Sequence, residues 1–333
     1  MKQWLVLILI LLLAETGRSQ GPSLSEDDLL RSYLEKRQDL LHTGTKQFTA
    51  DEQSELDRLE TTLKENYPDA YSTHLVVWLN GNYNLEKKTS LFRAYELDPD
   101  AKEVVNEMFA YYIITGDVAK QKEFAGRIKS QYSTNTLNYY RDLLPLMGIV
   151  VTSNYADSYP LYILQLLHSE GSELLIVNME FLRNESYKTR IQREAEIGTA
   201  AFVGNEDAWL TKLLSASTKT VTISSTVNQA YLSMTESLYL TGLGYEYNPK
   251  DQRKKLDAFW NKVKTRDLAS VQLTASEKKL YGNYLPALLT LYKLKLLNDE
   301  IDTLLKAGIE ALATKVNKSE TIDQILEDYE TSR

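Results

Sequence analysis

The sequence predicts a mainly α-helical protein with a small α/β segment in its middle, and two observations lead to this fold class. Before residue 145 and after residue 250, apolar residues recur at spacings of three and four, as on one face of an amphipathic helix. Between these parts, short apolar and β-branched runs alternate with a helical pattern. That alternation is typical of strands joined by crossover helices.

Residues 1–19 have the pattern of a secretory signal peptide. A cationic start at Lys2 precedes an apolar run from Trp4 to Ala14, and small and polar residues follow it. The run is shorter than the roughly 20 residues that a helix needs to cross a hydrocarbon core. We therefore expect cleavage near Ser19-Gln20 and an exported chain, periplasmic or secreted; an uncleaved signal anchor is the alternative.

The composition excludes several classes of function. The chain has no cysteine, which rules out a disulfide framework, a thiolate catalyst and a cysteine-based zinc site. A net charge of −8, without extended lysine or arginine clusters, makes nucleic acid an unexpected partner. His42, His74 and His168 lie far apart in the sequence, and no nucleotide-binding fingerprint is present. We expect no metal and no cofactor, and no membrane-spanning segment after the signal peptide.

Residues 20–145 are predicted to form a helical domain. Ser25, followed by three acidic residues, is a favourable start for a first helix with an apolar stripe. Thr49 and Glu52 form a capping box for a second helix, which Pro68 ends.

Residues 68–131 resemble tetratricopeptide repeats. A helix, a turn at Gly81-Asn82, a second helix and Pro99 are followed by another helix, a turn at Gly116-Asp117 and a fourth helix. Paired helices at a period of about 34 residues are the signature of these repeats. Ala94 and Pro99 match two late positions of the motif, whereas its early Trp-Leu-Gly signature is missing. Degenerate repeats of this kind stack into a curved surface, and an irregular helical bundle is the alternative.

Residues 146–250 are predicted to form the α/β segment. Met147 to Thr152 and Leu174 to Val177 have the composition of buried strands, and the helical pattern between them completes a βαβ-type unit. Thr220 to Thr226 is a third candidate strand, and Leu238 to Leu240 is a short fourth.

Residues 251–333 are predicted to be helical again. A capping box at Thr274 and Glu277 begins the longest of these helices. The predicted helices cover 251–264, the stretch from Thr274 to Leu296, 299–316 and 320–329.

Three segments in the middle of the chain resemble, in order, parts of the soluble tail of a Bacteroidota envelope family: Ser153 to Leu161, Ile176 to Leu182 and Leu238 to Tyr247. In that family an O-mannosyltransferase-like membrane half of unassigned function is joined to a periplasmic α/β tail, often with tetratricopeptide repeats. The membrane half has no counterpart in this sequence, and only Asp157 remains of the family's acidic turn. The resemblance thus implies a periplasmic compartment and an architecture, and it implies no particular activity.

The best candidate ligand site consists of Asn154, Asp157, Asn178 and Glu180, in the loops after the first two predicted strands. If these strands are parallel, their carboxyl ends meet at one edge of the sheet, where ligands bind in open α/β folds. Carboxylates and amides there suit a sugar, a cation or acid–base chemistry. The same residue types also cap helices, and capping is the favoured interpretation of Asp157 or Ser158 and of Asn178; it does not exclude ligand binding.

Two hypotheses on function follow. The first is an exported periplasmic scaffold or protein-interaction protein, built on helical repeats and bound to an envelope protein partner. The second is an envelope glycan-binding protein, or a degenerate glycan-processing enzyme that acts at the Asp157 loop. No nucleophile elbow, phosphate-binding loop or zinc-helix motif is present, which favours the first hypothesis and a protein that is not an enzyme.

Overall fold

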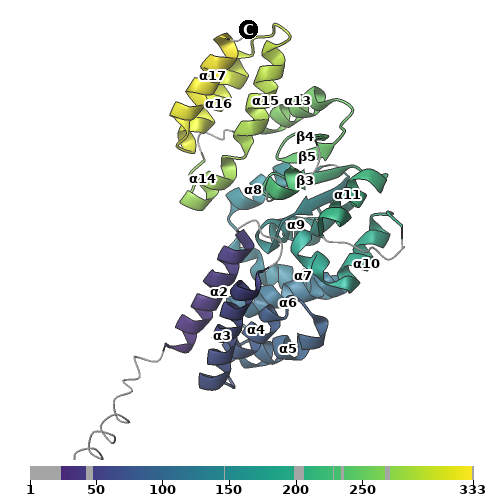
Figure 1. The fold of residues 1–333 in the computed structure, drawn as a ribbon. Helices are drawn as coiled ribbons and strands as arrows, with labels where there is room; N and C mark the ends of the chain where they lie inside the picture. Colours follow the sequence, from purple (N-terminus) through teal and green to yellow (C-terminus); the bar gives the residue numbers. More distant parts are fainter. Residues whose placement is uncertain are drawn as a thin grey trace, which may run out of the picture.

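The computed structural model describes residues 24–42, 48–145, 147–198, 206–227, 229–233, 236–266 and 271–331. It confirms a mainly α-helical fold with a small α/β segment. The N-terminal helices, the sheet with its covering helices, and the C-terminal helices follow one another along the molecule (Figure 1). Among the described residues, none of the helices has the length and apolar character needed to span a membrane.

The N-terminal part consists of three helix pairs that pack in chain order, followed by one more helix. Helix α2 also contacts α4, so the first helices of the first two pairs lie against each other. The capping box of Thr49 and Glu52 is present at the start of α3. The helices are α2 (Glu26–His42), α3 (Ala50–Asn66), α4 (Tyr71–Asn80), α5 (Lys88–Leu97), α6 (Lys102–Thr115), α7 (Val118–Ile128) and α8 (Thr134–Leu143), with 3-10 turns η1 (Leu85–Lys87) and η2 (Lys129–Gln131).

The sheet has five strands in the order β2-β1-β3-β5-β4. Strand β1 pairs in parallel with β2 and β3, whereas β5 is antiparallel to β3 and β4. The predicted βαβ unit is therefore present, whereas the short strand β5 was not predicted from the sequence. The strands are β1 (Gly148–Thr152), β2 (Leu174–Asn178), β3 (Val221–Ser224), β4 (Leu238–Leu240) and β5 (Gly244–Tyr247).

The helices of the α/β segment attach the sheet to the last N-terminal helix pair. The rings of Phe109 in α6 and Tyr159 in α9 lie 4.8 Å apart, edge to face. Arg190 of α10 donates from Nη2 to the carbonyl oxygen of Ile113 at 2.6 Å. The elements are α9 (Tyr155–His168), η3 (Met179–Arg183), α10 (Glu185–Glu194), α11 (Glu206–Ala216) and α12 (Gln229–Leu232).

The C-terminal helices are α13 (Gln252–Val263), α14 (Ala275–Tyr281), α15 (Tyr284–Leu296), α16 (Thr303–Lys315) and α17 (Ser319–Thr331). The single long helix predicted from Thr274 to Leu296 is wrong, because a turn at Gly282-Asn283 separates α14 from α15. The periodicity of apolar residues continues across this turn, since both helices bury a face against the same core.

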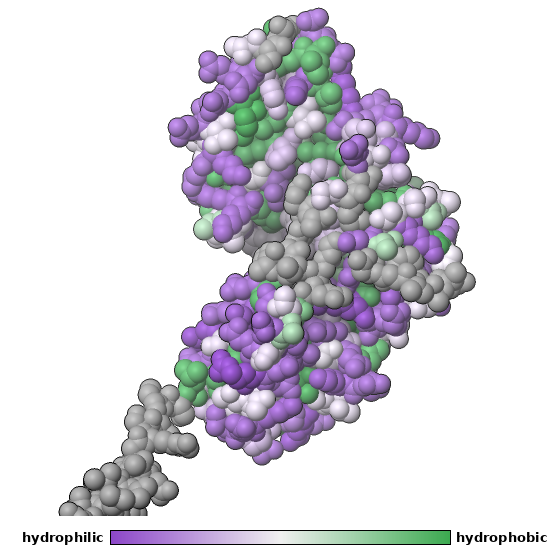
Figure 2. Space-filling model, viewed as in Figure 1, coloured by the Kyte–Doolittle hydropathy of each residue, from purple (hydrophilic) through white to green (hydrophobic). Residues whose placement is uncertain are grey.

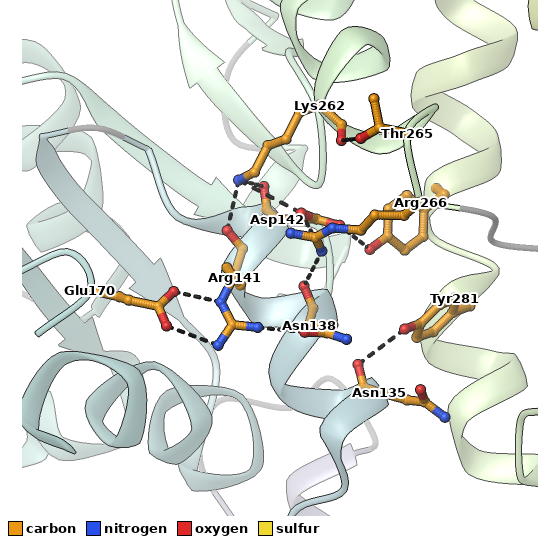
Figure 3. A network of polar contacts seen from close by, with 10 residues as sticks. Asn135, Asn138, Arg141, Asp142, Glu170, Lys262, Thr265, Arg266 and Tyr281 are labelled. Carbon is orange, nitrogen blue, oxygen red and sulfur yellow. Dashed lines mark hydrogen bonds and ion pairs between the residues drawn. The ribbon is translucent and has the colours of Figure 1, made fainter. Parts of the chain in front are cut away.

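A polar network joins α8 to these C-terminal helices (Figure 3). The side chain of Asp142 is fully buried and accepts a hydrogen bond from the Tyr284 hydroxyl at 2.8 Å. Arg266 places Nη1 2.8 Å from Asp142 Oδ1. On the other side of α8, Arg141 binds both carboxylate oxygens of Glu170, at 2.6 and 2.8 Å. The network thus ties α8 both to the loop before β2 and to the C-terminal helices.

Candidate functional site

The parallel pairing of β1 and β2 places the loops after the two strands side by side. Thr152 and Asn178, the last residues of the strands, are in register. One step further, the Glu180 N–H donates to the Ser153 carbonyl oxygen at 3.3 Å. The four residues of the candidate site therefore lie at one edge of the sheet, although they do not share one environment.

Asn154 lies at the N-cap of α9, whereas Asp157 lies inside the helix. Asn154 caps the helix, because its Oδ1 accepts from the Ala156 N–H at 2.9 Å. The prediction that Asp157 or Ser158 caps this helix is therefore wrong, because the helix begins at Tyr155 and both residues lie within it. Asp157 lies inside the first turn, buried, and accepts from the Tyr140 hydroxyl at 2.5 Å. Burial, together with this carboxylate, raises the pKa of Tyr140 well above its usual value.

Asn178 is fully buried and its side chain is engaged in internal hydrogen bonds. Its Oδ1 accepts from the Glu180 N–H at 2.9 Å and caps η3, as capping predicts. Its Nδ2 donates to Ser158 Oγ at 3.0 Å. Asn178 and Asp157 thus act as internal supports of the loops.

A cavity of about 410 Å³ lies between the N-terminal helices and this edge of the sheet. It is lined by residues of α2, α6 and η2, the end of α4, the start of α9, and η3. Asn154 and Glu180 line it, whereas Asp157 and Asn178 do not. Its volume is within the range of small-molecule sites in proteins. We call it the Arg37 cavity, after the cation on its wall.

Arg37 and Glu180 form a buried ion pair at this cavity, with exposed fractions of 5% and 7%. Arg37 Nη2 lies 3.6 Å from Glu180 Oε1, which is too long for a hydrogen bond. Asn82 accepts from Arg37 Nη1 at 3.0 Å, and the Tyr83 hydroxyl donates to Glu180 Oε1 at 3.3 Å. These contacts hold both charged groups in place without using all of their polar atoms.

Two atoms of this pair have no hydrogen-bond partner among the described residues: Arg37 Nη2, a donor, and Glu180 Oε2, an acceptor. Leaving a buried polar atom unpaired costs about 1–3 kcal/mol. Both side chains line the cavity, and a small rotation of each would turn these shielded atoms toward a bound molecule, which could then satisfy both and recover this free energy.

Glu107 of α6 is a second buried carboxylate of the cavity. Its Oε2 accepts from Trp78 Nε1 at 2.9 Å. Burial raises the pKa of Glu107 to about 7, against the opposing effects of the Trp78 hydrogen bond and the positive charge of Arg37. The carboxylate therefore changes its charge near neutral pH.

The remaining wall of the cavity is aromatic and amide-bearing. Tyr132 and Tyr155 line it and are both half-buried. Asn106 and Gln131 exchange side-chain hydrogen bonds of 3.3 and 3.1 Å, which joins α6 to η2 on the same side of the cavity.

Arg37, Glu107 and Tyr83 were not predicted from the sequence as site residues. A signal was present for two of them. Arg37 follows Leu30, Tyr33 and Leu34 on the apolar stripe of α2, and Glu107 lies on the buried face of α6. A charge on an otherwise buried helix face requires a partner, so both residues could have been singled out.

No group of three or more residues that could hold a metal ion occurs among the described positions. His74 and His168 lie in α4 and α9. The chain matches no protein-family model, no curated protein and no solved structure. Function is therefore inferred from the Arg37 cavity.

Proposed function

We propose that this protein is a binding protein whose ligand enters the Arg37 cavity. One observation carries this proposal: two side chains of the cavity wall, Arg37 and Glu180, each have a buried polar atom with no hydrogen-bond partner in the part of the chain that the structure describes. Folding alone does not favour such an arrangement, because each unpaired atom destabilises the folded chain. A ligand that fills the cavity gives the arrangement a physical reason.

The residues of the cavity favour binding over catalysis. None of its described lining residues is serine, threonine, cysteine or histidine, so catalysis by a hydroxyl, thiol or imidazole group has no candidate there. Its two buried carboxylates, Glu107 and Glu180, are each held by an aromatic hydrogen-bond donor. The alternative of a glycan-processing enzyme at the Asp157 loop has less support, since Asp157 bonds to Tyr140 and does not line the cavity.

We propose an exported location for this binding protein, on the evidence of the sequence. Residues 1–19, with the expected cleavage near Ser19-Gln20, lie outside the described residues, and the signal peptide stays a prediction. The resemblance to the Bacteroidota periplasmic tails supports the same compartment.

Ligand retention tests the proposal. The purified protein is incubated with a small-molecule extract of its host cells and re-isolated by gel filtration, and the molecules it carries are identified by mass spectrometry. We expect at least one molecule to be retained by the wild type and to be reduced about tenfold or more by Glu180→Gln, which removes a charged acceptor.

Glu206→Gln is the matched control for this experiment. Glu206 is also a partly buried glutamate in a loose ion pair, 3.7 Å from Arg183, and it does not line the cavity. It should retain the molecule as the wild type does. Retention that is equal in all three proteins, or absent from the wild type, contradicts the proposal.

A second function, the binding of an envelope protein partner, is favoured by one feature of the C-terminal helices. Leu297, Ile301 and Leu304 surround the turn between α15 and α16 with exposed fractions of 71%, 66% and 62%. Figure 2 shows apolar residues gathered on this end of the molecule. Clusters of exposed apolar side chains are typical of protein-interaction surfaces.

Cross-linking in cells tests this second function. We expect the triple variant Leu297→Gln, Ile301→Gln, Leu304→Gln to lose a cross-linked envelope protein that the wild type captures. Val118→Gln, which replaces a side chain that is 64% exposed on α7, is the control and should keep it. Capture of the same partner by all proteins rules out this surface.

A further inference from the structure

We infer that the Arg37 cavity binds an α-ammonium group together with its neighbouring carbonyl or carboxylate, as found in a free amino acid or at the N-terminus of a peptide. The inference rests on the proposed binding function and specifies the class of ligand. Its parts are the two unpaired atoms, the balance of charge, and the aromatic wall.

The two unpaired atoms require a ligand with a donor and an acceptor side by side. Arg37 Nη2 offers a hydrogen atom, and Glu180 Oε2 offers a lone pair. They belong to side chains that already lie 3.6 Å apart at their nearest charged atoms. In an α-amino acid or a peptide N-terminus, the ammonium nitrogen and the carbonyl or carboxylate oxygen are attached to adjacent carbon atoms. One small unit can therefore reach both side chains.

The balance of charge selects an ammonium group as the donor. Two buried carboxylates, Glu107 and Glu180, face one guanidinium, Arg37, so the buried wall has an excess of negative charge when Glu107 is ionised. The nearby Lys102 and Glu103 offset each other. A buried charge is stabilised by an opposite charge, which an ammonium supplies and a neutral hydroxyl does not.

The aromatic wall is suited to the same group. Tyr83, Tyr132 and Tyr155 line the cavity, and aromatic faces attract ammonium ions at distances up to about 6 Å. Leu34 and Leu79 add apolar surface against which the side chain of an amino acid can pack. A sugar would also find aromatic and amide partners here, but it would place no cationic donor beside the two carboxylates.

Glu107 should couple this binding to pH. Besides burial, the pKa of Glu107 depends on Trp78 from α4, Arg37 from α2 and Glu180 from η3. Burial raises the pKa of Tyr83, Tyr155 and Tyr159, and the charge of Glu107 adds to this effect. An ammonium group interacts more favourably with ionised than with protonated Glu107. Affinity should therefore rise by roughly threefold to tenfold from about pH 5.5 to about pH 7.5.

Calorimetry with defined probes tests the ligand class. The purified protein is screened by thermal shift against the common L-amino acids and the corresponding X-Gly dipeptides, and the best probe is then titrated beside its N-acetylated form. We expect the free amine to bind at least about tenfold more tightly than the N-acetyl form. A preference between amino acid and dipeptide identifies the source of the ammonium group.

Two isosteric variants complete the design. Glu180→Gln should weaken the best probe by about tenfold or more, and Glu107→Gln should remove most of the rise in affinity with pH. Thermal unfolding of each variant shows that it is folded. Both substitutions keep the side-chain volume, so a loss of binding in a folded variant reports the charge.

Three outcomes would overturn the inference: no binding of any amino acid or dipeptide, equal binding of the free and N-acetylated probes, or binding of neutral sugars such as mannose in their place. In each case the retention experiment with cell extract decides separately whether the cavity binds another ligand. A molecule retained there and lost in Glu180→Gln keeps the proposed function and replaces only the ligand class.

Discussion

Glu107 is a buried carboxyl group whose charge changes near neutral pH. Its pKa is about 7 in the folded protein, raised by burial from the usual value of 4.5. A carboxyl group with a raised pKa contributes stability in its protonated form. That contribution is complete below the unfolded-state pKa and is lost as the pH rises through about 7.

We therefore predict that the wild type loses on the order of 3 kcal/mol of folding free energy between about pH 4.5 and about pH 8 because of this group. Glu107→Gln should lose correspondingly less over the same range, since glutamine has no charge to bury. Urea unfolding at several pH values measures both curves. Parallel curves for the two proteins would show that Glu107 is not buried as described.

Gly148, at the start of β1, gives a second prediction at the residue scale. Its φ of 116° lies in a region that side chains rarely adopt, and an added Cβ would lie 2.3 Å from the Thr220 carbonyl oxygen. Gly148→Ala should destabilise the protein by roughly 2–4 kcal/mol, through strain and the disturbed β1–β3 pairing.

Gly126 in α7 is the matched control, because a Cβ there meets nothing within 4 Å. Gly126→Ala should be neutral or stabilise the helix by up to about 1 kcal/mol. Thermal unfolding compares the two variants directly. A Gly148→Ala protein as stable as the wild type would contradict the close pairing of β1 with the residue before β3.

At the scale of elements, the attachment of α8 depends on one buried charge. Asp142 is fully buried beside Tyr284 and Arg266, whereas the neighbouring pair of Arg141 and Glu170 is partly exposed, at 30% and 31%. Buried charge networks are sensitive to the loss of one member, and exposed pairs contribute little.

Asp142→Asn should therefore lower the free energy of unfolding by about 1–3 kcal/mol, and Glu170→Gln by less than about 1 kcal/mol. Amide hydrogen exchange provides a local readout. We expect faster exchange in α13 to α15 for Asp142→Asn only. Similar effects of both substitutions would mean that the network does not anchor the C-terminal helices.

At the scale of the whole molecule, the helices and strands were easier to predict from the sequence than the contacts between them. Apolar periodicity was sufficient for the helix pairs, and β-branched runs were sufficient for β1, β2 and β3. Strand β5 reads Gly-Tyr-Glu-Tyr and has no β-branched residue, and the turn at Gly282-Asn283 does not interrupt the apolar pattern, so neither left a clear signal.

The candidate site shows the same limit. The loops after β1 and β2 could be paired from the sequence, because parallel strands end at one edge. Arg37 and Glu180, however, lie far apart in the sequence, in α2 and η3. Only the folded chain brings their side chains to within 3.6 Å of each other. The sequence also could not show that Asp157 is hydrogen-bonded to Tyr140, and Asn178 to Ser158.

The central claim, that the Arg37 cavity is a ligand site, is tested most directly by a crystal structure of the protein with the molecule that it retains. The account predicts density for that molecule within hydrogen-bond distance of both Arg37 Nη2 and Glu180 Oε2. Density at another place, or a ligand-free crystal in which these two atoms hydrogen-bond to each other and close the cavity, would contradict it.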